Sequence, residues 1–179
     1  MPTRIDMLVD KHGRQLKDLR ISVTDRCNFR CRYCMPREKF GSNHAFMPRR
    51  AFLSFEEIEK VVISCKELGL EKVRITGGEP LLRPKLHELI KKLSKLNLDI
   101  ALTTNGSLLR KHAKDLAAAG LNRVTISLDA LSQEIHTKMT DSQTSIETIL
   151  DGCLDGHKQR IVLLNFGPES RPVWAHWAW

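Results

Sequence analysis

Aromatic residues are scarce in this sequence, at 6% of 179 residues, and no apolar run reaches the roughly 18 residues that a membrane-spanning helix needs. The first residues contain no apolar segment of the kind found in secretory signals, and Asp6, Asp10 and Asp18 argue against an organellar transit peptide. Cysteine occurs only five times, and this odd number argues against a disulfide scaffold and for a reducing compartment. We therefore expect a cytoplasmic protein that does not associate with a membrane.

Acidic residues are outnumbered by basic ones, and the formal net charge is +8. A positive charge of this size favours an anionic partner. The basic residues are spread along the chain, and aromatic residues are too few for a surface on which nucleic-acid bases stack. We expect a small phosphorylated ligand and no nucleic acid.

Strand and helix patterns alternate along most of the chain, as a βα unit repeated three times after a first strand. Ser54 and Glu57 form a capping-box pattern before one helix, and Pro84 is expected to open another. The expected strands are 19–24, 72–76, 99–103 and 123–128, with a further short strand at 160–166, and the expected helices are 54–68, a segment from 84 to 96, and about 107–119. Alternation of this kind predicts an α/β fold with a parallel sheet.

Polar and glycine residues follow four of the expected strands, at 24–25, 76–79, 103–106 and 127–129. Any one of these endings is a common turn. The carboxyl ends of parallel strands share one rim, where active sites form. Because one of the endings leads into a cluster of cysteines, we expect the site at this rim.

Cys27, Cys31 and Cys34 form a C-x3-C-x2-C pattern directly after the first strand. Thiolates are the usual ligands of iron–sulfur clusters, and three of them leave one iron of a cubane open. Structural zinc would need a fourth ligand, and His12, His44, Cys65 and Cys153 all lack the usual spacing. A thioredoxin-type pair of Cys31 and Cys34 would leave Cys27 without a role. For Cys65 and Cys153 we expect ordinary packing in the core.

This cysteine pattern, with Tyr33 before the last cysteine, resembles the signature of the radical S-adenosylmethionine (SAM) superfamily. The resemblance implies a [4Fe–4S] cluster whose open iron binds SAM, cleavage of SAM to a 5′-deoxyadenosyl radical, and an incomplete parallel (βα) partial TIM barrel. The segment 76–80, Thr-Gly-Gly-Glu-Pro, is similar to the superfamily segment that contacts the SAM amino group.

The stretches 19–36, 73–84, 103–106 and 125–131 narrow the resemblance to the GTP 3′,8-cyclase family, over about residues 5–153. Members are lyases that convert GTP to (8S)-3′,8-cyclo-7,8-dihydroguanosine 5′-triphosphate in molybdenum cofactor biosynthesis. The resemblance assigns no catalytic side chain, because the radical comes from the cofactor. It assigns Cys27, Cys31 and Cys34 to the cluster, Tyr33, Gly78 and Ser127 to SAM, and Arg20, Arg74 and Thr103 to GTP. A salt bridge within the strands is the alternative role for Arg20 and Arg74.

The chain departs from the family after about residue 155. It has neither the second cysteine triplet, which implies a second [4Fe–4S] cluster in the family, nor the carboxyl-terminal Gly-Gly. All three tryptophans lie in the last six residues. We therefore expect a radical SAM core at 1–155, a tail at 156–179 outside the family fold, and a truncated enzyme.

An electron donor is the further partner that the resemblance implies, and homodimer formation is left open. Two alternatives to the cyclase also stay open. One is a non-catalytic fragment that binds the cluster or SAM, and the other is a radical SAM enzyme with another substrate.

Overall fold

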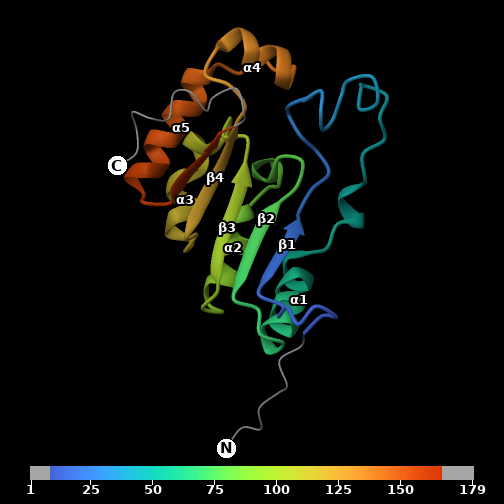
Figure 1. Cartoon of the computed structure of the whole chain (residues 1–179), viewed down its shortest axis with the longest axis vertical. Helices are drawn as coiled ribbons and strands as arrows, with labels where there is room; N and C mark the ends of the chain where they lie inside the picture. Colours follow the sequence, from blue (N-terminus) through green and yellow to red (C-terminus); the bar gives the residue numbers. More distant parts are fainter. Residues whose placement is uncertain (1–8, 167–179) are drawn as a thin grey trace, which may run out of the picture.

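One parallel sheet organises the computed structural model, which describes residues 9–166 (Figure 1). Its strands follow one another in chain order, and every neighbouring pair is parallel. The strands are β1 (Asp18–Ser22), β2 (Lys72–Thr76), β3 (Asp99–Thr104), β4 (Arg123–Leu128) and β5 (Val162–Phe166). The helices are α1 (Phe55–Glu67), α2 (Leu86–Ser94), α3 (Leu109–Ala118), α4 (Gln133–Thr140) and α5 (Ile146–Lys158). The predicted α/β fold, an incomplete parallel barrel, is confirmed.

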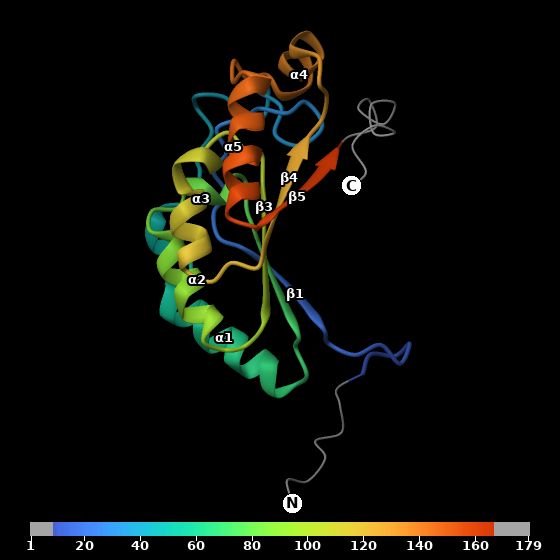
Figure 2. The same ribbon diagram turned by 90° about the vertical axis from the view of Figure 1, so that its left-hand side faces the viewer.

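The helices α1, α2, α3 and α5 lie on one face of the sheet and pack against one another in that order (Figure 2). Each helix connects two parallel strands and so returns the chain over the same face. Within residues 9–166 the opposite face carries no helix (Figure 2), and we call it the open face. Helix α4 lies beyond the carboxyl ends of the strands (Figure 1).

The hydrophobic core lies between the sheet and the helix layer. In β2, Val73 and Ile75 are fully buried beneath the helices, whereas Arg74 between them projects to the open face. This alternation follows from the two-residue period of a strand. The largest fully buried side chains of the strands and the helix layer are Ile58, Ile75, Leu89, Ile90, Leu93, Ile100, Leu102, Leu109, Leu116, Ile126, Leu128 and Ile149. Burial of these side chains fixes which face of the sheet stays polar.

Local sequence signals predicted most element positions, and the capping box of α1 is confirmed. Ser54 Oγ accepts from the Glu57 N–H at 3.1 Å, and the Glu57 carboxylate accepts from the Ser54 N–H at 2.7 Å. The prediction that Pro84 opens a helix is wrong. Helix α2 begins at Leu86, and Lys85 before it has a φ of 60°, a left-handed conformation that no local pattern announced.

The buried face of α1 is narrow. Val61 and Leu68 are 44% and 38% exposed, whereas Ile58 and Val62 are buried. Helix α1 stands at the end of the helix layer and has a helix neighbour, α2, on one side only. Only a narrow stripe of α1, which includes Ile58 and Val62, is therefore buried against the rest of the core.

Two helices, α4 and α5, were missed by the sequence patterns. Ser132 and Ser145 cap them, and their hydroxyls accept from the N–H groups of Ile135 and Thr148. Helix α5 continues through residue 155, and β5 pairs with β4, so residues 156–166 extend a helix and the sheet. The domain boundary at 155 stays a prediction, and the tryptophans lie outside the described residues. Among residues 9–166, no helix combines the length and apolar character that crossing a membrane requires.

Gly106 follows β3 and packs against buried side chains of the core, so a substitution there tests this packing. Its φ is +81°, and a Cβ there would lie 2.9 Å from methyl groups of Ile126 and Ile149. Gly13 has a similar φ of +74° but nothing within 4 Å of a Cβ. We expect Gly106→Ala to lower the free energy of unfolding by about 2–5 kcal/mol, from backbone strain plus overpacking, and Gly13→Ala by only about 1–2 kcal/mol. Urea unfolding measures both, and equal losses would contradict the packing of Gly106.

Candidate active site

The candidate site lies where the carboxyl ends of β1–β4 meet (Figure 1). The segment after β1 carries the three clustered cysteines, and the loops after β2, β3 and β4 carry Gly78, Asn105 and Asp129. Because the strands are parallel and in register, these loops come together although they lie up to about one hundred residues apart. The rim predicted from the strand endings is therefore present.

Cys27 and Cys31 are half-buried, Cys34 is exposed, and all three are free thiols. Burial is the main cause that raises the pKa of the Cys31 thiol to about 11, and burial also raises the pKa of Cys27. These two groups are therefore protonated at neutral pH in the cluster-free chain. Because metals bind the thiolate, loading of a metal would release protons.

The donor set fits an iron–sulfur cluster. Three soft thiols stand in one loop, and the Phe29 N–H donates to Cys27 Sγ at 3.4 Å. Cys65 and Cys153, two of the candidate fourth ligands for zinc, lie on α1 and α5 and not at the rim. Within the part of the chain that is described, no three His, Cys, Asp or Glu side chains converge so as to hold a single metal ion.

The Arg30 side chain holds the cysteine loop together by hydrogen bonds to its backbone. Its guanidinium donates to the carbonyl oxygens of Cys27 at 2.7 Å, Phe29 at 2.9 Å and Phe40 at 2.8 Å. A planar group with five donors can hold three carbonyls at once, which no lysine could do in this geometry. Arg30 was not recognised from the sequence, because the atoms it binds are backbone atoms that carry no residue signature.

Helix α4 supports the same loop from outside. The N–H groups of Arg30 and Arg32 donate to the carbonyls of Thr140 and Met139 at the end of α4, at 2.9 and 3.1 Å. The ion pair of Arg37 with Asp141, at 2.5 Å, lies just beyond. The loop is thus fastened to a helix more than one hundred residues later in the chain.

The Gly-Gly-Glu segment after β2 packs directly on the start of the cysteine loop. The Gly78 N–H donates to the Thr24 carbonyl at 2.8 Å, and a Cβ at Gly78 would collide with the Arg26 carbonyl and lie 3.0 Å from Cys27 N. Neither glycine of the pair has a positive φ. The two glycines are therefore needed for close approach of two backbones and not for a left-handed turn.

Glu79 links three segments of the rim. Its N–H donates to the Arg26 carbonyl, and its fully buried carboxylate accepts from the Leu81 N–H at 3.0 Å, the Thr104 hydroxyl at 2.7 Å and the Asn105 N–H at 2.8 Å. Burial raises the pKa of this carboxyl, and the three hydrogen bonds act in the opposite direction. The loops after β2 and β3 are therefore held in one arrangement.

Tyr33 and His136 lie on the side of the cysteine loop that faces β4 and α4. The Tyr33 hydroxyl donates to an Asp129 carboxylate oxygen at 2.8 Å, which joins the loop to the end of β4. His136 is 1% exposed and packs edge-on against Phe29, with ring centroids 5.8 Å apart. Neither ring nitrogen of His136 has a hydrogen-bond partner within the described structure.

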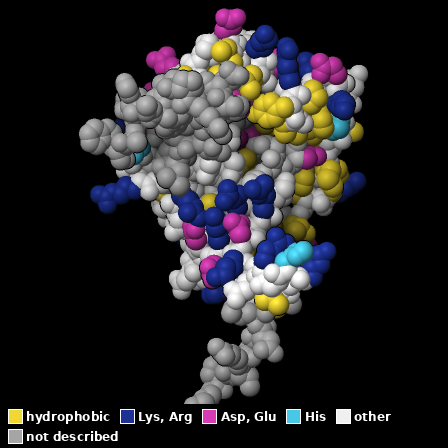
Figure 3. All heavy atoms as spheres, viewed as in Figure 1, with side chains coloured by type: hydrophobic (Ala, Val, Ile, Leu, Met, Phe, Trp, Pro, Cys, Tyr) yellow, Lys and Arg dark blue, Asp and Glu magenta, His cyan; other side chains and the backbone are white. Residues whose placement is uncertain are grey.

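The residues predicted to bind GTP share the open face. Arg20 and Arg74 are register partners on β1 and β2, and Thr103 on β3 lies two residues beyond Ala101, the partner of Arg74. Lys and Arg side chains gather on this face together with Asp and Glu (Figure 3). Asp18 lies 3.9 Å from the Arg74 guanidinium, so the salt bridge named as the alternative role is present for Arg74. Arg20 is exposed, because β1 is an edge strand and its open face has no covering layer among residues 9–166.

Ser127, predicted to contact SAM, lies near the end of β4 on the same face and is exposed. Its register position is two residues beyond Thr125, the partner of Thr103. The structure thus brings the predicted SAM and GTP residues to one face and one rim.

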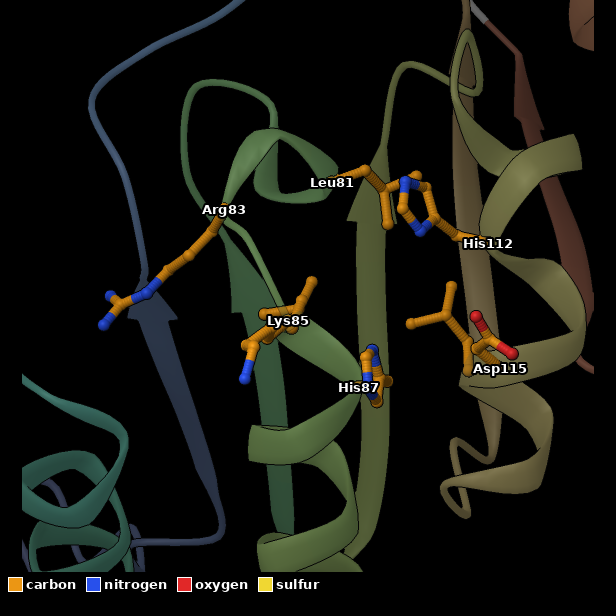
Figure 4. A pocket seen from close by; sticks show the side chains of 8 residues that line it. Leu81, Arg83, Lys85, His87, His112 and Asp115 are labelled. Atoms are coloured by element: carbon orange, nitrogen blue, oxygen red, sulfur yellow. The ribbon is translucent and has the colours of Figure 1, made fainter.

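A separate hollow between α2 and α3 is lined by residues that include His87, His112 and Asp115 and contains none of the predicted site residues (Figure 4).

Comparison with known sequences decides the family. Residues 21–163 match a sequence model described as the Radical SAM superfamily. The chain belongs to this superfamily. Superfamily membership implies a [4Fe–4S] cluster and SAM, and it confirms the resemblance seen in the cysteine motif.

Similar proteins include GTP 3′,8-cyclases and a solved radical SAM structure. The GTP 3′,8-cyclase of Staphylococcus epidermidis is 48% identical over 148 residues, which are 82% of this chain and 44% of that protein. The GTP 3′,8-cyclase of Acidothermus cellulolyticus is 52% identical over 80% of this chain and 40% of its own length. Streptococcus suis SuiB, solved bound to S-adenosylmethionine, has a TM-score of 0.60 at 18% identity over 89% of this chain and 43% of that chain, which concerns the fold alone. The chain thus spans less than half the length of these relatives.

The buried, unpartnered His136 predicts a dependence of stability on pH. Burial is the main cause that lowers its pKa below the ordinary value of about 6.5, so the folded state favours the neutral ring. The contribution of neutral His136 to the free energy of unfolding is therefore fully present above about pH 6.5. It falls as the pH drops below this value, because the unfolded chain takes up the proton first. We expect this fall to be smaller in His136→Phe, measured by urea unfolding between about pH 5 and 7.5.

His112→Phe is a second variant for comparison, because burial lowers the pKa of His112 as well, but this residue lies on α3. We expect a smaller loss of stability at low pH in each of the two variants, His136→Phe and His112→Phe. In the double variant the two reductions should add. Parallel pH profiles for wild type and His136→Phe would contradict the burial of a neutral His136.

Proposed function

We propose that this chain is the SAM-cleaving part of an enzyme of the GTP 3′,8-cyclase type. The observation that carries the proposal is the contact of the cysteine loop with the Gly-Gly-Glu segment at the rim. The chain is 48% and 52% identical to two of these cyclases over 82% and 80% of its length. The reaction is conversion of GTP to (8S)-3′,8-cyclo-7,8-dihydroguanosine 5′-triphosphate, in molybdenum cofactor biosynthesis.

Cys27, Cys31 and Cys34 hold one [4Fe–4S] cluster in this proposal. With SAM bound, the cluster would supply the one electron that cleaves SAM to methionine and the 5′-deoxyadenosyl radical. The chain's own residues bind and orient SAM: Gly78, Tyr33 and Ser127 contact it. Because the thiols of Cys27 and Cys31 are protonated in the free chain, cluster loading is favoured by higher pH.

Arg20, Arg74 and Thr103 bind GTP on the open face. A guanidinium is a permanently charged planar donor that suits phosphate oxygens. Arg20 is exposed and has no ion pair among the described residues, so it is available to an anion without loss of an internal contact. Arg74 would exchange its Asp18 contact for a phosphate. A cytoplasmic location and an external electron donor complete the proposal.

A second candidate, which the sequence left open, is a module that binds the cluster and SAM but does not convert GTP. The chain spans 40–44% of the length of the similar cyclases. In this reading Cys27, Cys31 and Cys34 keep their roles, and the open face binds GTP weakly or not at all.

Anaerobic reconstitution with iron and sulfide, followed by dithionite, SAM and GTP, tests the proposal. We expect an iron–sulfur absorption spectrum and formation of 5′-deoxyadenosine in the wild type. Cys31→Ser should abolish both, because two thiolates cannot retain the cluster. Cys65→Ser is the matched control, since Cys65 is also half-buried but lies on α1, and it should leave both unchanged.

The products separate the two candidates. A cyclised GTP product identifies the cyclase, whereas 5′-deoxyadenosine whose amount is the same with and without GTP identifies the module. A wild-type chain that takes up no cluster would overturn both.

A further inference from the structure

Among the described residues, Asn105 is a side chain outside the cysteine loop that approaches a predicted cluster ligand. It follows β3, and its Nδ2 lies 4.0 Å from Sγ of Cys27 and 2.9 Å from Oδ1 of Asn28. Cys27 and Asn105 are 78 residues apart in the chain. The contact therefore comes from the junction of two rim loops and not from a local turn.

The orientation of the Asn105 amide follows from its neighbours. Its Oδ1 accepts from the Ser107 N–H at 3.0 Å and from the Ser107 hydroxyl at 2.7 Å. A backbone N–H can only donate, so the atom facing it must be the amide oxygen. The NH₂ group then faces Asn28 and Cys27, with one hydrogen for the Asn28 carbonyl oxygen and the other toward the sulfur.

The backbone of Asn105 is held as firmly as its side chain. The Asn105 N–H donates to Glu79 Oε2 at 2.8 Å, and the preceding Thr104 hydroxyl donates to Glu79 Oε1 at 2.7 Å. Glu79 is 0% exposed, and its own N–H donates to the Arg26 carbonyl, next to Cys27. Both ends of the Asn105–Cys27 contact are thus fastened to the same buried residue.

We propose that Asn105 is a positioning residue that donates an N–H···S hydrogen bond to Cys27 and thereby raises the reduction potential of the cluster. This inference rests on the proposed function, in which Cys27 is a cluster ligand. Hydrogen bonds to ligand sulfurs are a lever by which proteins tune such clusters. The reduced cluster carries one more negative charge than the oxidised one, and a donor at the sulfur stabilises that charge.

A purely structural role is the competing explanation. The bonds from Ser107 to Asn105 Oδ1 form an Asx turn, for which asparagine is commonly used. Loss of a turn would lower stability but would leave the potential unchanged. A redox measurement therefore separates the two roles.

The test is a redox titration of the reconstituted full chain, followed by electron paramagnetic resonance of the reduced cluster. Asn105→Ser retains the backbone N–H to Glu79 and a short hydroxyl for the turn, but it has no amide to reach Cys27. We expect a more negative midpoint potential, equivalent to a two- to tenfold lower ratio of reduced to oxidised cluster at a fixed potential. A tenfold change is about 59 mV for a one-electron couple.

Asn122→Ser is the matched control. The Asn122 side chain accepts from the Ile100 N–H at 2.8 Å, at the opposite end of the sheet, so the same substitution removes a comparable bond far from the cluster. It should leave the potential unchanged. If Asn105→Ser fails to retain a cluster, Asn105→Asp keeps the oxygen that caps the turn and is titrated in its place, beside Asn28→Asp, which adds a similar charge but leaves the Asn105 donor intact.

An equal potential in wild type and Asn105→Ser, or an equal shift in Asn105→Asp and Asn28→Asp, would overturn the inference while the proposed function stands. Absence of a cluster in the wild type would overturn both. A shift that is specific to Asn105 supports the hydrogen bond.

Discussion

The rim of this protein depends on one buried carboxylate, that of Glu79. Burial of a charged group is costly unless donors replace the lost water, and Glu79 accepts from two backbone N–H groups and one hydroxyl. Those donors belong to the loop after β2, to the last residue of β3 and to the loop after it, while the Glu79 N–H donates to the Arg26 carbonyl before Cys27. One residue thereby sets the relative positions of three loops that belong to different βα units. Movement of any one of them would leave buried polar groups without partners, which opposes such movement.

The two faces of the sheet have different roles: one packs in the hydrophobic core, and the other presents the polar residues of the candidate site. On the helix side, apolar residues at every second strand position, such as Val73 and Ile75, fill the core. On the open side the alternate positions carry Arg20, Arg74 and Ser127, and this face has no covering layer within residues 9–166. Because the core needs only one face, the other is free to present charge. That division explains how residues assigned to two different ligands come to share one surface.

The cysteine loop has little regular structure of its own and takes its shape from distant elements. Arg30 gathers three carbonyls from within it, and the end of α4 binds two of its N–H groups from outside. Helix α4 therefore serves the rim more than the core, which agrees with its place beyond the strand ends (Figure 1). A loop held in this way can keep its thiols in place before any cluster is bound.

The sequence by itself determined the family, all five strands and three of the helices. The alternation of strand and helix patterns located β2 and β4, Ser54 and Glu57 located the start of α1, and the spacing of Cys27, Cys31 and Cys34 indicated the superfamily, because each of these signals is local. Tertiary structure decided the rest. The left-handed Lys85 before α2, the exposure of Val61 and the burial of His136 depend on neighbours from other elements. So do the Arg30 contacts and the approach of Asn105 to Cys27, since backbone carbonyls and long-range junctions leave no pattern in the order of residues.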